Sequence, residues 1–282
     1  MNKMKRIPTL RRGLLAVALS HFLIISISQF LLSCEKEIDI DYHEADPQYV
    51  VEASLTNSLA TVRITQTVPM RGSQSSDRVV ENATVVISSG DSVRHTARYS
   101  TNGKYIYPFS AYPGTRYQVD IDVDGHHFTS SSTLQSKPEV SKFRFVWKKM
   151  MSTRILFADL SIKDFPGQQN YYFIHMYRNN VGYRWTVLRD TSNPGKELQQ
   201  LLGCMSEDST DEDNILRNGD RINIEVRAID RASYDYLFSL SQAANNGSNP
   251  VANFTGGCLG YFSAYIPYNI NVTYQESETE EE

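Results

Sequence analysis

Short runs of alternating apolar and polar residues fill the chain from Tyr49 onward, with Gly, Asn, Asp or Pro between them. In the clearest run, residues 119–123, an apolar residue at every second position alternates with Asp120 and Asp122. A period of two is the pattern of a strand that buries one face. The runs before residue 138 therefore predict seven strands, over residues 49–55, 60–68, 84–88, 93–99, 104–109, 117–123 and 128–134.

Turn residues between these runs indicate antiparallel hairpins. Asn102-Gly103 and Asp124-Gly125 tolerate the positive φ of tight turns, and Pro113-Gly114 marks a corner. About seven short strands within roughly 100 residues are typical of an immunoglobulin-like or prealbumin-like sandwich. We therefore expect a first β domain over residues 48–137.

A second antiparallel β domain with one helix is expected over residues 138–274. The helix is predicted at residues 231–244, because aromatic and leucine residues recur at helical spacing after the capping residue Asp230. The glycine-rich residues 256–260 are interpreted as a bulged strand packed under this helix, since glycine lets two backbones approach closely. The fold class is thus mainly β, and the further strands are predicted over residues 143–149, 155–162, 171–177, 183–188 and 222–229.

The first 33 residues are typical of a secretory signal, with five basic residues, an apolar stretch and the small residue Ser33 before the break. Because Leu31-Leu32-Ser33 is followed by Cys34, we expect a lipoprotein signal and acylation of Cys34 as the first residue of the mature chain. One alternative is a transmembrane helix over residues 13–33, although His21 and Gln29 interrupt the apolar stretch. A second alternative is cleavage as an ordinary secreted protein.

Acidic residues 34–47 and 275–282 flank the two domains. The first stretch is predicted to be a tether that lifts the body off the membrane. The second lacks a core residue and is predicted to be disordered. The string after Cys34, Glu-Lys-Glu-Ile-Asp-Ile-Asp, resembles the export signals of surface lipoproteins in Bacteroidota. We therefore expect a location at the bacterial outer membrane, with the body facing the cell exterior.

The charge balance excludes one class of partner. Without residues 1–33, which hold five of the 28 basic residues and no acid, the chain has 23 basic and 32 acidic residues, a net charge of −9. Nucleic-acid binding needs a basic face that displaces counterions from phosphates, so no nucleic-acid partner is expected. The negative charge also opposes lying flat on anionic lipid, which leaves the anchoring to the acyl chains.

Cys204 and Cys258 remain besides Cys34, an even pair in a compartment where disulfides persist. We hypothesise that the two are bridged, and the alternative is a pair of buried thiols. Zinc is less favoured, because the sequence has no CxxC or HxxH spacing.

The candidate motifs for catalysis or metal binding lack residues that the chemistry requires. The string from Asp120 to Gly125 opens like a calcium loop, but the twelfth position is Ser131 and not a bidentate glutamate. His126 and His127 are adjacent and point to opposite faces of a strand. The sequence has no Gly-x-Ser-x-Gly elbow, and the acidic loop at residues 206–214 is interpreted as solvated. We therefore expect no catalytic residue, no metal and no cofactor.

Tyr183 and Trp185 are separated by one residue and therefore share a face of any strand through them. Such a pair could stack on a sugar or a peptide. The competing interpretation is packing in the core or across strands.

Several strings in both halves of the chain are similar to those of one family. In the second half they are Leu216-Arg217-Asn218-Gly219-Asp220, Ile222-Asn223-Ile224-Glu225-Val226 and residues 253–265. In the first half they are Tyr49-Val50-Val51-Glu52-Ala53 and Pro113-Gly114-Thr115-Arg116-Tyr117. The chain resembles the Bacteroidota lipoproteins with the domain of unknown function numbered 4249. This resemblance implies association with a TonB-dependent outer-membrane transporter, and it carries over no catalytic residues because the family's activity is unassigned.

Together these observations predict a lipid-anchored binding or accessory protein without enzymatic activity, whose ligand the sequence does not name. Two alternatives stay open. One is a surface hydrolase of glycans or peptides, and the other is a structural or adhesive surface protein.

Overall fold

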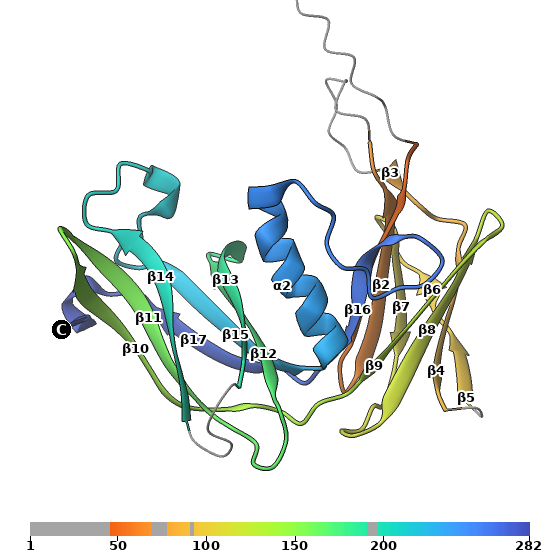
Figure 1. The fold of residues 1–282 in the computed structure, drawn as a ribbon, viewed down its shortest axis with the longest axis horizontal. Coiled ribbons are helices and arrows are strands. Elements are labelled where there is room, and N and C mark those ends of the chain that lie inside the picture. The colour runs from red at the N-terminus through yellow and green to blue at the C-terminus, as the bar shows by residue number, and fades with distance from the viewer. Residues whose placement is uncertain (1–45, 69–77, 91–92, 191–196) are drawn as a thin grey trace, which may run out of the picture. The chain divides into compact units, whose positions relative to one another are not determined.

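The strands between residues 49 and 133 form two sheets that enclose one hydrophobic core, called here the first sandwich (Figure 1). The computed structural model describes residues 46–68, 78–90, 93–190 and 197–282. One sheet has the order β16-β1-β2-β7-β6, with β3 also paired to β2, and the other has the order β5-β4-β8-β9. Their bounds are β1 Tyr49–Leu55, β2 Leu59–Gln66, β3 Arg78–Val79, β4 Thr84–Ser89, β5 Val93–Thr96, β6 Arg98–Tyr99, β7 Lys104–Pro108, β8 Arg116–Val123, β9 His126–Thr133 and β16 Leu259–Ala264.

Alternation of side chains builds this core. Val51 of β1, Ile121 of β8 and Phe128 of β9 are almost fully buried in one cluster, while their neighbours along the strands face outward. Six of the seven predicted strands and the Asp124-Gly125 turn are confirmed, since β8 pairs with β9 across that turn. The predicted strand 93–99 is instead two strands, β5 and β6, which lie in different sheets.

The later strands form a second pair of four-stranded sheets around a second core, called here the second sandwich. One sheet has the order β14-β11-β10-β18 and the other β13-β12-β15-β17. The bounds are β10 Glu139–Met150, β11 Thr153–Lys163, β12 Tyr171–Arg178, β13 Val181–Arg189, β14 Glu197–Ser206, β15 Arg221–Ile229, β17 Tyr268–Thr273 and β18 Glu280–Glu281. The mainly β fold is confirmed.

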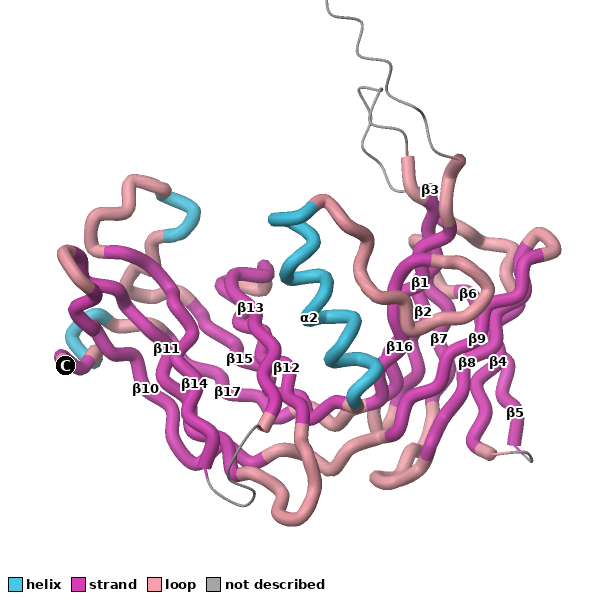
Figure 2. The backbone as a smooth tube through the Cα atoms, in the orientation of Figure 1, coloured by secondary structure: helices cyan, strands magenta, loops and turns pink. Residues whose placement is uncertain are grey.

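The helix α2, Arg231–Asn246, matches its prediction and packs against β12, β13 and β16 (Figure 2). Asp230 caps its start, because its carboxylate accepts a hydrogen bond from the Ser233 amide at 2.9 Å. Gly247 ends it with a φ of 65°. Among the described residues no helix is long and apolar enough to cross a membrane.

Strand β16 brings the glycine-rich stretch back to the first sandwich, where it lies parallel to β1. A Cβ atom on Gly260 would lie 1.9 Å from the Val51 carbonyl oxygen, so only glycine permits this approach. The strand also contacts α2, but it begins at Leu259 and pairs with β1 without a bulge, so only the last two of residues 256–260 lie in it. Residues Asp46–Glu282 form one compact unit, and the domain boundary placed at residue 138 stays a prediction.

The acidic residues 275–282, called here the acidic segment, differ from the expectation of disorder. They contain the short 3-10 helix η2, Glu276–Glu278, and the strand β18, which pairs with β10. The physical reason is the charge opposite them, because Arg144, Lys148 and Arg154 form ion pairs with the glutamates. The remaining 3-10 helix, η1, covers Glu212–Asn214.

Candidate functional site

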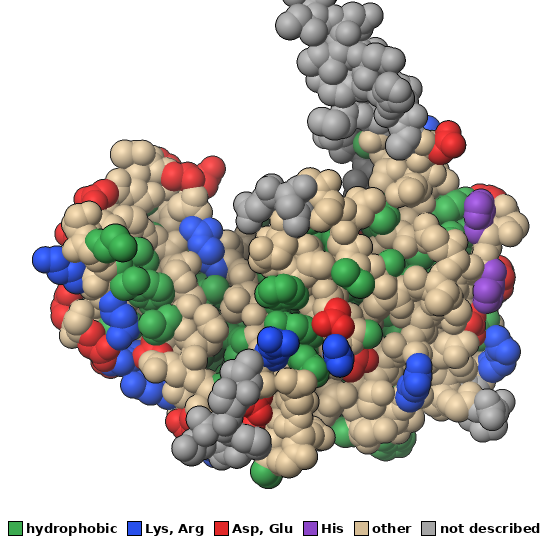
Figure 3. All heavy atoms as spheres, viewed as in Figure 1, with side chains coloured by type: hydrophobic (Ala, Val, Ile, Leu, Met, Phe, Trp, Pro, Cys, Tyr) green, Lys and Arg blue, Asp and Glu red, His purple; other side chains and the backbone are tan. Residues whose placement is uncertain are grey.

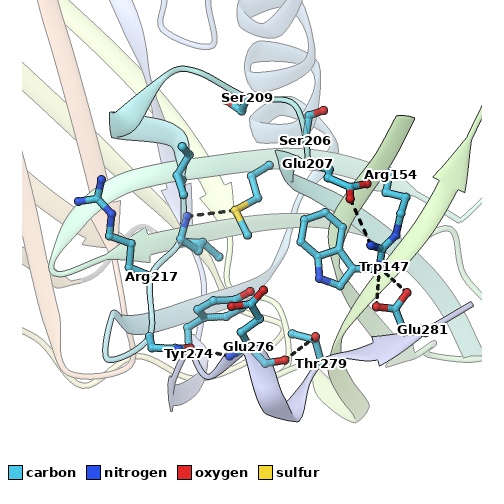
Figure 4. A pocket seen from close by; sticks show the side chains of 14 residues that line it. Trp147, Arg154, Ser206, Glu207, Ser209, Arg217, Tyr274, Glu276, Thr279 and Glu281 are labelled. Carbon is cyan, nitrogen blue, oxygen red and sulfur yellow. Dashed lines mark hydrogen bonds and ion pairs between the residues drawn. The ribbon is translucent and has the colours of Figure 1, made fainter. Parts of the chain in front are cut away.

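A pocket of about 560 Å³ lies at one end of the sheet that contains β10, β11 and β14 (Figure 4). Its wall combines strand residues with the loop after β14 and with the acidic segment. We call it the Trp147 pocket, and the side chains used below are Trp147, Arg154, Glu207, Tyr274, Glu276 and Glu281.

Trp147 and Arg154 form the aromatic and cationic part of the pocket. Trp147 lies on β10 and belongs to the second core, with 9% of its surface exposed. The Arg154 guanidinium of β11 lies over its ring, 5.1 Å from the centroid, in cation–π geometry. Arg154 also pairs with Glu207 at 3.4 Å and with Glu281 (Figure 4). A guanidinium stacked on an aromatic ring between two carboxylates is a ready partner for polar or charged ligands.

Tyr274 contributes a buried hydroxyl to the pocket wall. Its side chain is 1% exposed, and its hydroxyl has no hydrogen-bond partner among the described residues. Burial, followed by the negative charge of Glu276, raises the pKa of Tyr274 to about 12. Leaving a buried hydroxyl unpaired costs about 1–3 kcal/mol.

A second hollow of about 600 Å³ lies against β13 and the loop that contains η1. Tyr183 and Arg184 line it, and both donate to the Cys204 carbonyl of β14. The Tyr183 hydroxyl lies 2.7 Å from the Cys204 carbonyl oxygen and 2.6 Å from that of Asn214. Arg184 donates to the same Cys204 carbonyl at 2.8 Å.

The structure corrects the expectation that Tyr183 and Trp185 share a face. Tyr183 packs against the second core, whereas the Trp185 ring lies on the other side of β13, 5.9 Å from Phe173. The reason is a β-bulge, because Met176 pairs with Arg184 and the next residue of β12 already pairs with Gly182. The two aromatic rings therefore cannot form one stacking surface.

The two cysteines are free thiols in separate clusters. Cys258 belongs to the core of the first sandwich, and Cys204 to that of the second. Their hypothesised disulfide is therefore absent from the structure, which has the alternative arrangement of two buried thiols. Burial raises the pKa of each thiol to about 12. The predicted lipidation site, Cys34, lies outside the described residues.

The aspartates of the calcium-like string are engaged within the first sandwich. Asp120 faces Arg94 at 3.4 Å, Asp122 faces His127 at 2.8 Å, and Asp124 accepts from the Tyr49 hydroxyl at 2.8 Å. These contacts agree with a hairpin. No group of three metal-ligating side chains occurs among the described residues.

The acidic loop is likewise paired with neighbouring groups. Asp208 accepts from the Thr153 hydroxyl at 2.8 Å, Asp211 caps η1, and Glu212 forms an ion pair with Arg217. Of the acidic residues of this loop, Glu207 lines the Trp147 pocket, where it pairs with Arg154.

Sequence reasoning did not identify Trp147, Arg154 or Tyr274 as site residues. Trp147 belongs to the alternating run Phe143, Phe145, Trp147, which is typical of a core strand, and it is indeed mostly buried. Arg154 could only have been found through its acidic partners, which lie far away in the sequence.

Comparison with known proteins gives one result on the family and none on activity. The family model described as a domain of unknown function (DUF4249) matches residues 35–270. No curated protein matches the chain. Because the model covers most of the chain, the protein belongs to the DUF4249 family of domains of unknown function.

Proposed function

We propose that this protein is a lipid-anchored binding or accessory protein of the outer membrane, which faces the cell exterior and works beside a TonB-dependent transporter. The anchor is Cys34, and the ligand site is the Trp147 pocket. The observation that carries the binding role is the pocket itself, where the Trp147 ring, the Arg154 guanidinium and two carboxylates converge.

The pocket favours binding over a reaction because its charged groups already hold one another. Glu207 and Glu281 both pair with Arg154, and Arg154 is stacked on Trp147. While the acidic segment is docked, side chains held in this way present a defined set of donors, acceptors and ring surface to a ligand.

Tryptophan fluorescence tests the pocket directly, since the chain has two tryptophans. In a Trp185→Phe variant, Trp147 is the single reporter. We expect its emission to change on titration with one class of a panel of soluble oligosaccharides and short peptides. The matched control is Trp147→Phe, which leaves Trp185 on the other side of the second sandwich and should report nothing. Unchanged Trp147 emission with every class would count against this pocket.

The anchor is tested by Cys34→Ala in the full-length precursor. We expect the variant to leave the membrane fraction, while the control Cys258→Ala stays there. Retention of the Cys34→Ala protein would contradict the anchor. Protease treatment of intact cells tests the outward orientation, which predicts digestion of the body without cell lysis.

The partner is tested by purification in mild detergent. We expect the wild-type protein to co-purify with a TonB-dependent transporter and to show no turnover of glycans or peptides. Isolation of the protein alone under conditions that preserve other transporter complexes would contradict the accessory role.

A surface hydrolase is the second candidate, because Glu207, Glu276 and Glu281 all line one pocket. Cleavage of a glycan or peptide that Glu276→Gln abolishes would favour it. The control is Glu278→Gln, a neighbouring glutamate outside the pocket lining.

A further inference from the structure

The edge of β10 is occupied by residues of the same chain that lie more than 130 positions away. Glu280 and Glu281 of β18 pair in parallel with Val146 and Trp147. The next amide, that of Glu282, donates to the Trp147 carbonyl at 3.0 Å. The acidic segment is therefore bound as an added strand.

The side chains of this added strand point alternately to its two faces, and basic residues lie on both faces. Glu280 and Glu282 both pair with Arg144, and Glu282 also pairs with Lys148. Glu281 points to the other face, where it pairs with Arg154 at the Trp147 pocket. Alternate sides are the geometry of consecutive strand residues. Figure 3 shows this mixture of acidic and basic side chains at the left edge of the molecule, where β10 and β11 lie.

The occupant is short in comparison with the edge that it covers. Strand β18 has two residues, both exposed, against the 12 residues of β10. Exposed ion pairs contribute about 0–1 kcal/mol each. Arg144 is different, because it also binds the fully buried Asp159 at 3.0 Å, a partner outside the segment. Arg144 and Arg154 thus have partners outside the segment, while the acidic segment itself is weakly held.

We propose that the β10 edge is a docking site for an extended acidic segment of a partner protein, and that residues 275–282 fill this site in cis until the partner segment replaces them. The ligand class is a peptide strand with carboxylates at three consecutive positions. Charge complementarity to Arg144, Lys148 and Arg154 selects it, and main-chain pairing with β10 aligns it. This site goes beyond the proposed function, because it needs neither the lipid anchor nor a transporter.

The test measures binding of a labelled peptide copy of residues 275–282 by fluorescence anisotropy. It uses the full chain and a full-length variant whose own segment is neutralised by Glu280→Gln, Glu281→Gln and Glu282→Gln. We expect the variant to bind the peptide about tenfold tighter than the wild type. In the wild type the protein's own segment occupies most sites, and the apparent affinity falls in proportion to the fraction of sites that are open. Equal affinity for the two proteins would overturn the proposal.

A matched pair of lysines separates the site from general charge attraction. In the neutralised variant, Lys148→Gln should weaken peptide binding about fivefold, the loss of roughly one charge-assisted contact. Lys149→Gln makes the same charge change at an exposed neighbour with no ion pair to the segment, and it should leave binding unchanged. Equal losses in the two variants would overturn the site.

A matched pair of peptides separates strand pairing from charge. Peptides with Glu282→Pro and Glu282→Gln carry the same charge, but only the first lacks the amide that donates to the Trp147 carbonyl. We expect the proline peptide to bind at least threefold more weakly, since that loss removes one main-chain hydrogen bond. The wild type could instead form a concentration-dependent dimer that is lost in the neutralised variant. That result would identify the segment of a second copy as the occupant and would contradict the proposal of a different partner protein.

Discussion

At the scale of single residues, the Tyr274 hydroxyl is the least expected feature of the second core. The ring itself is well placed, because it meets Phe145 edge-on with centroids 5.2 Å apart. The hydroxyl adds nothing to this packing and has no partner among the described residues. Leaving this oxygen unpaired in the core costs free energy that the ring contact with Phe145 offsets.

The first prediction concerns this hydroxyl. Tyr274→Phe keeps the ring and removes the unpaired oxygen, so we expect the free energy of unfolding to stay constant or rise by about 1 kcal/mol. Urea unfolding of the two proteins measures the difference. Phe145→Leu is the control for ring packing and should destabilise the same core. A Tyr274→Phe variant that loses more than about 1.5 kcal/mol would show that the hydroxyl has a partner.

The second prediction concerns the two thiols, tested in a Cys34→Ala chain. Burial raises the pKa of Cys204 and Cys258 to about 12, and the thiolate is the form that reacts with iodoacetamide. We therefore expect no labelling of the native protein at pH 8 and two labels in urea without reductant, as measured by mass spectrometry. If labels appear only after reduction, the two cysteines are bridged.

Residue spacing alone could not place Tyr183 and Trp185. Alternation assigns one face to both, and the β-bulge between β12 and β13 reverses that assignment. A bulge depends on the partner strand, which the local sequence does not identify. By contrast, the caps of α2 are local, because Asp230 and Gly247 act on the helix that they adjoin.

At the scale of elements, β16 packs so closely against the first sandwich that one of its positions must be glycine. Its Gly260 has a φ of 103° and faces the Val51 carbonyl, and Gly256 faces the His127 carbonyl in the same way. These glycines let one strand lie against two strands of the first sandwich. The glycine-rich string therefore has a structural use that needs no ligand.

The third prediction tests that fit. Gly260→Ala should destabilise the protein by more than about 2 kcal/mol, since the new Cβ combines a backbone clash with a positive φ. Gly257→Ala is the matched control, because Gly257 has a φ of 90° but nothing within 4 Å of the added atom. Urea unfolding of both variants separates the two costs. Equal losses would show that the close approach to Val51 contributes nothing.

Element prediction succeeded where alternation was regular and failed where it was interrupted. Strand β14 was missed because Gln200 breaks the pattern of core residues Leu198, Leu202 and Cys204. Strand β17 carried a readable signal, since Tyr268, Ile270 and Val272 alternate with polar residues and pack against the second core. It was not predicted, because the run is short and contains asparagines, which are uncommon in strands.

At the scale of the whole molecule, segments distant in sequence are held together by polar contacts that no local pattern contains. Asp230 caps α2 and also accepts from the Ser132 hydroxyl at 2.6 Å and the Thr133 amide at 3.0 Å. Ser132 in turn accepts from the Ala264 amide at 2.9 Å. These bonds join β9, α2 and β16, so the first sandwich depends on residues that lie in the sequence between β15 and β17, two strands of the second sandwich.

The Trp147 pocket is a product of this long-range assembly. Its wall needs β10, the loop after β14 and the acidic segment together, and composition favoured disorder for the last of these. Acidic composition describes a segment in isolation. Arg144, Lys148 and Arg154 change the outcome, because they offset the repulsion among its carboxylates.

The fourth prediction is the pH dependence of that contact. Hydrogen bonds from Lys148, followed by Arg144, lower the pKa of Glu282 from 4.5 to about 2. Arg144 also holds Glu280 and Asp159, so its charge is shared among three carboxylates. A carboxyl with a lowered pKa stabilises the docked state above its ordinary pKa. We therefore expect docking to be fully favoured above about pH 4.5 and lost progressively as the pH falls toward 2.

The titration of the Glu282 carboxyl carbon, followed by NMR in protein labelled at glutamate, measures this shift. Lys148→Gln removes the largest cause, so its Glu282 should titrate closer to 4.5 than the wild type does. Lys149→Gln, with no ion pair to the segment, should titrate like the wild type. In each protein the segment should leave β10 over the pH range in which Glu282 is protonated, because Lys148 and Arg144 bind the ionised carboxylate. A wild-type Glu282 that titrates at its ordinary pKa would show that the segment is not bound to β10 in solution. That result would also contradict the proposal that residues 275–282 fill the docking site in cis.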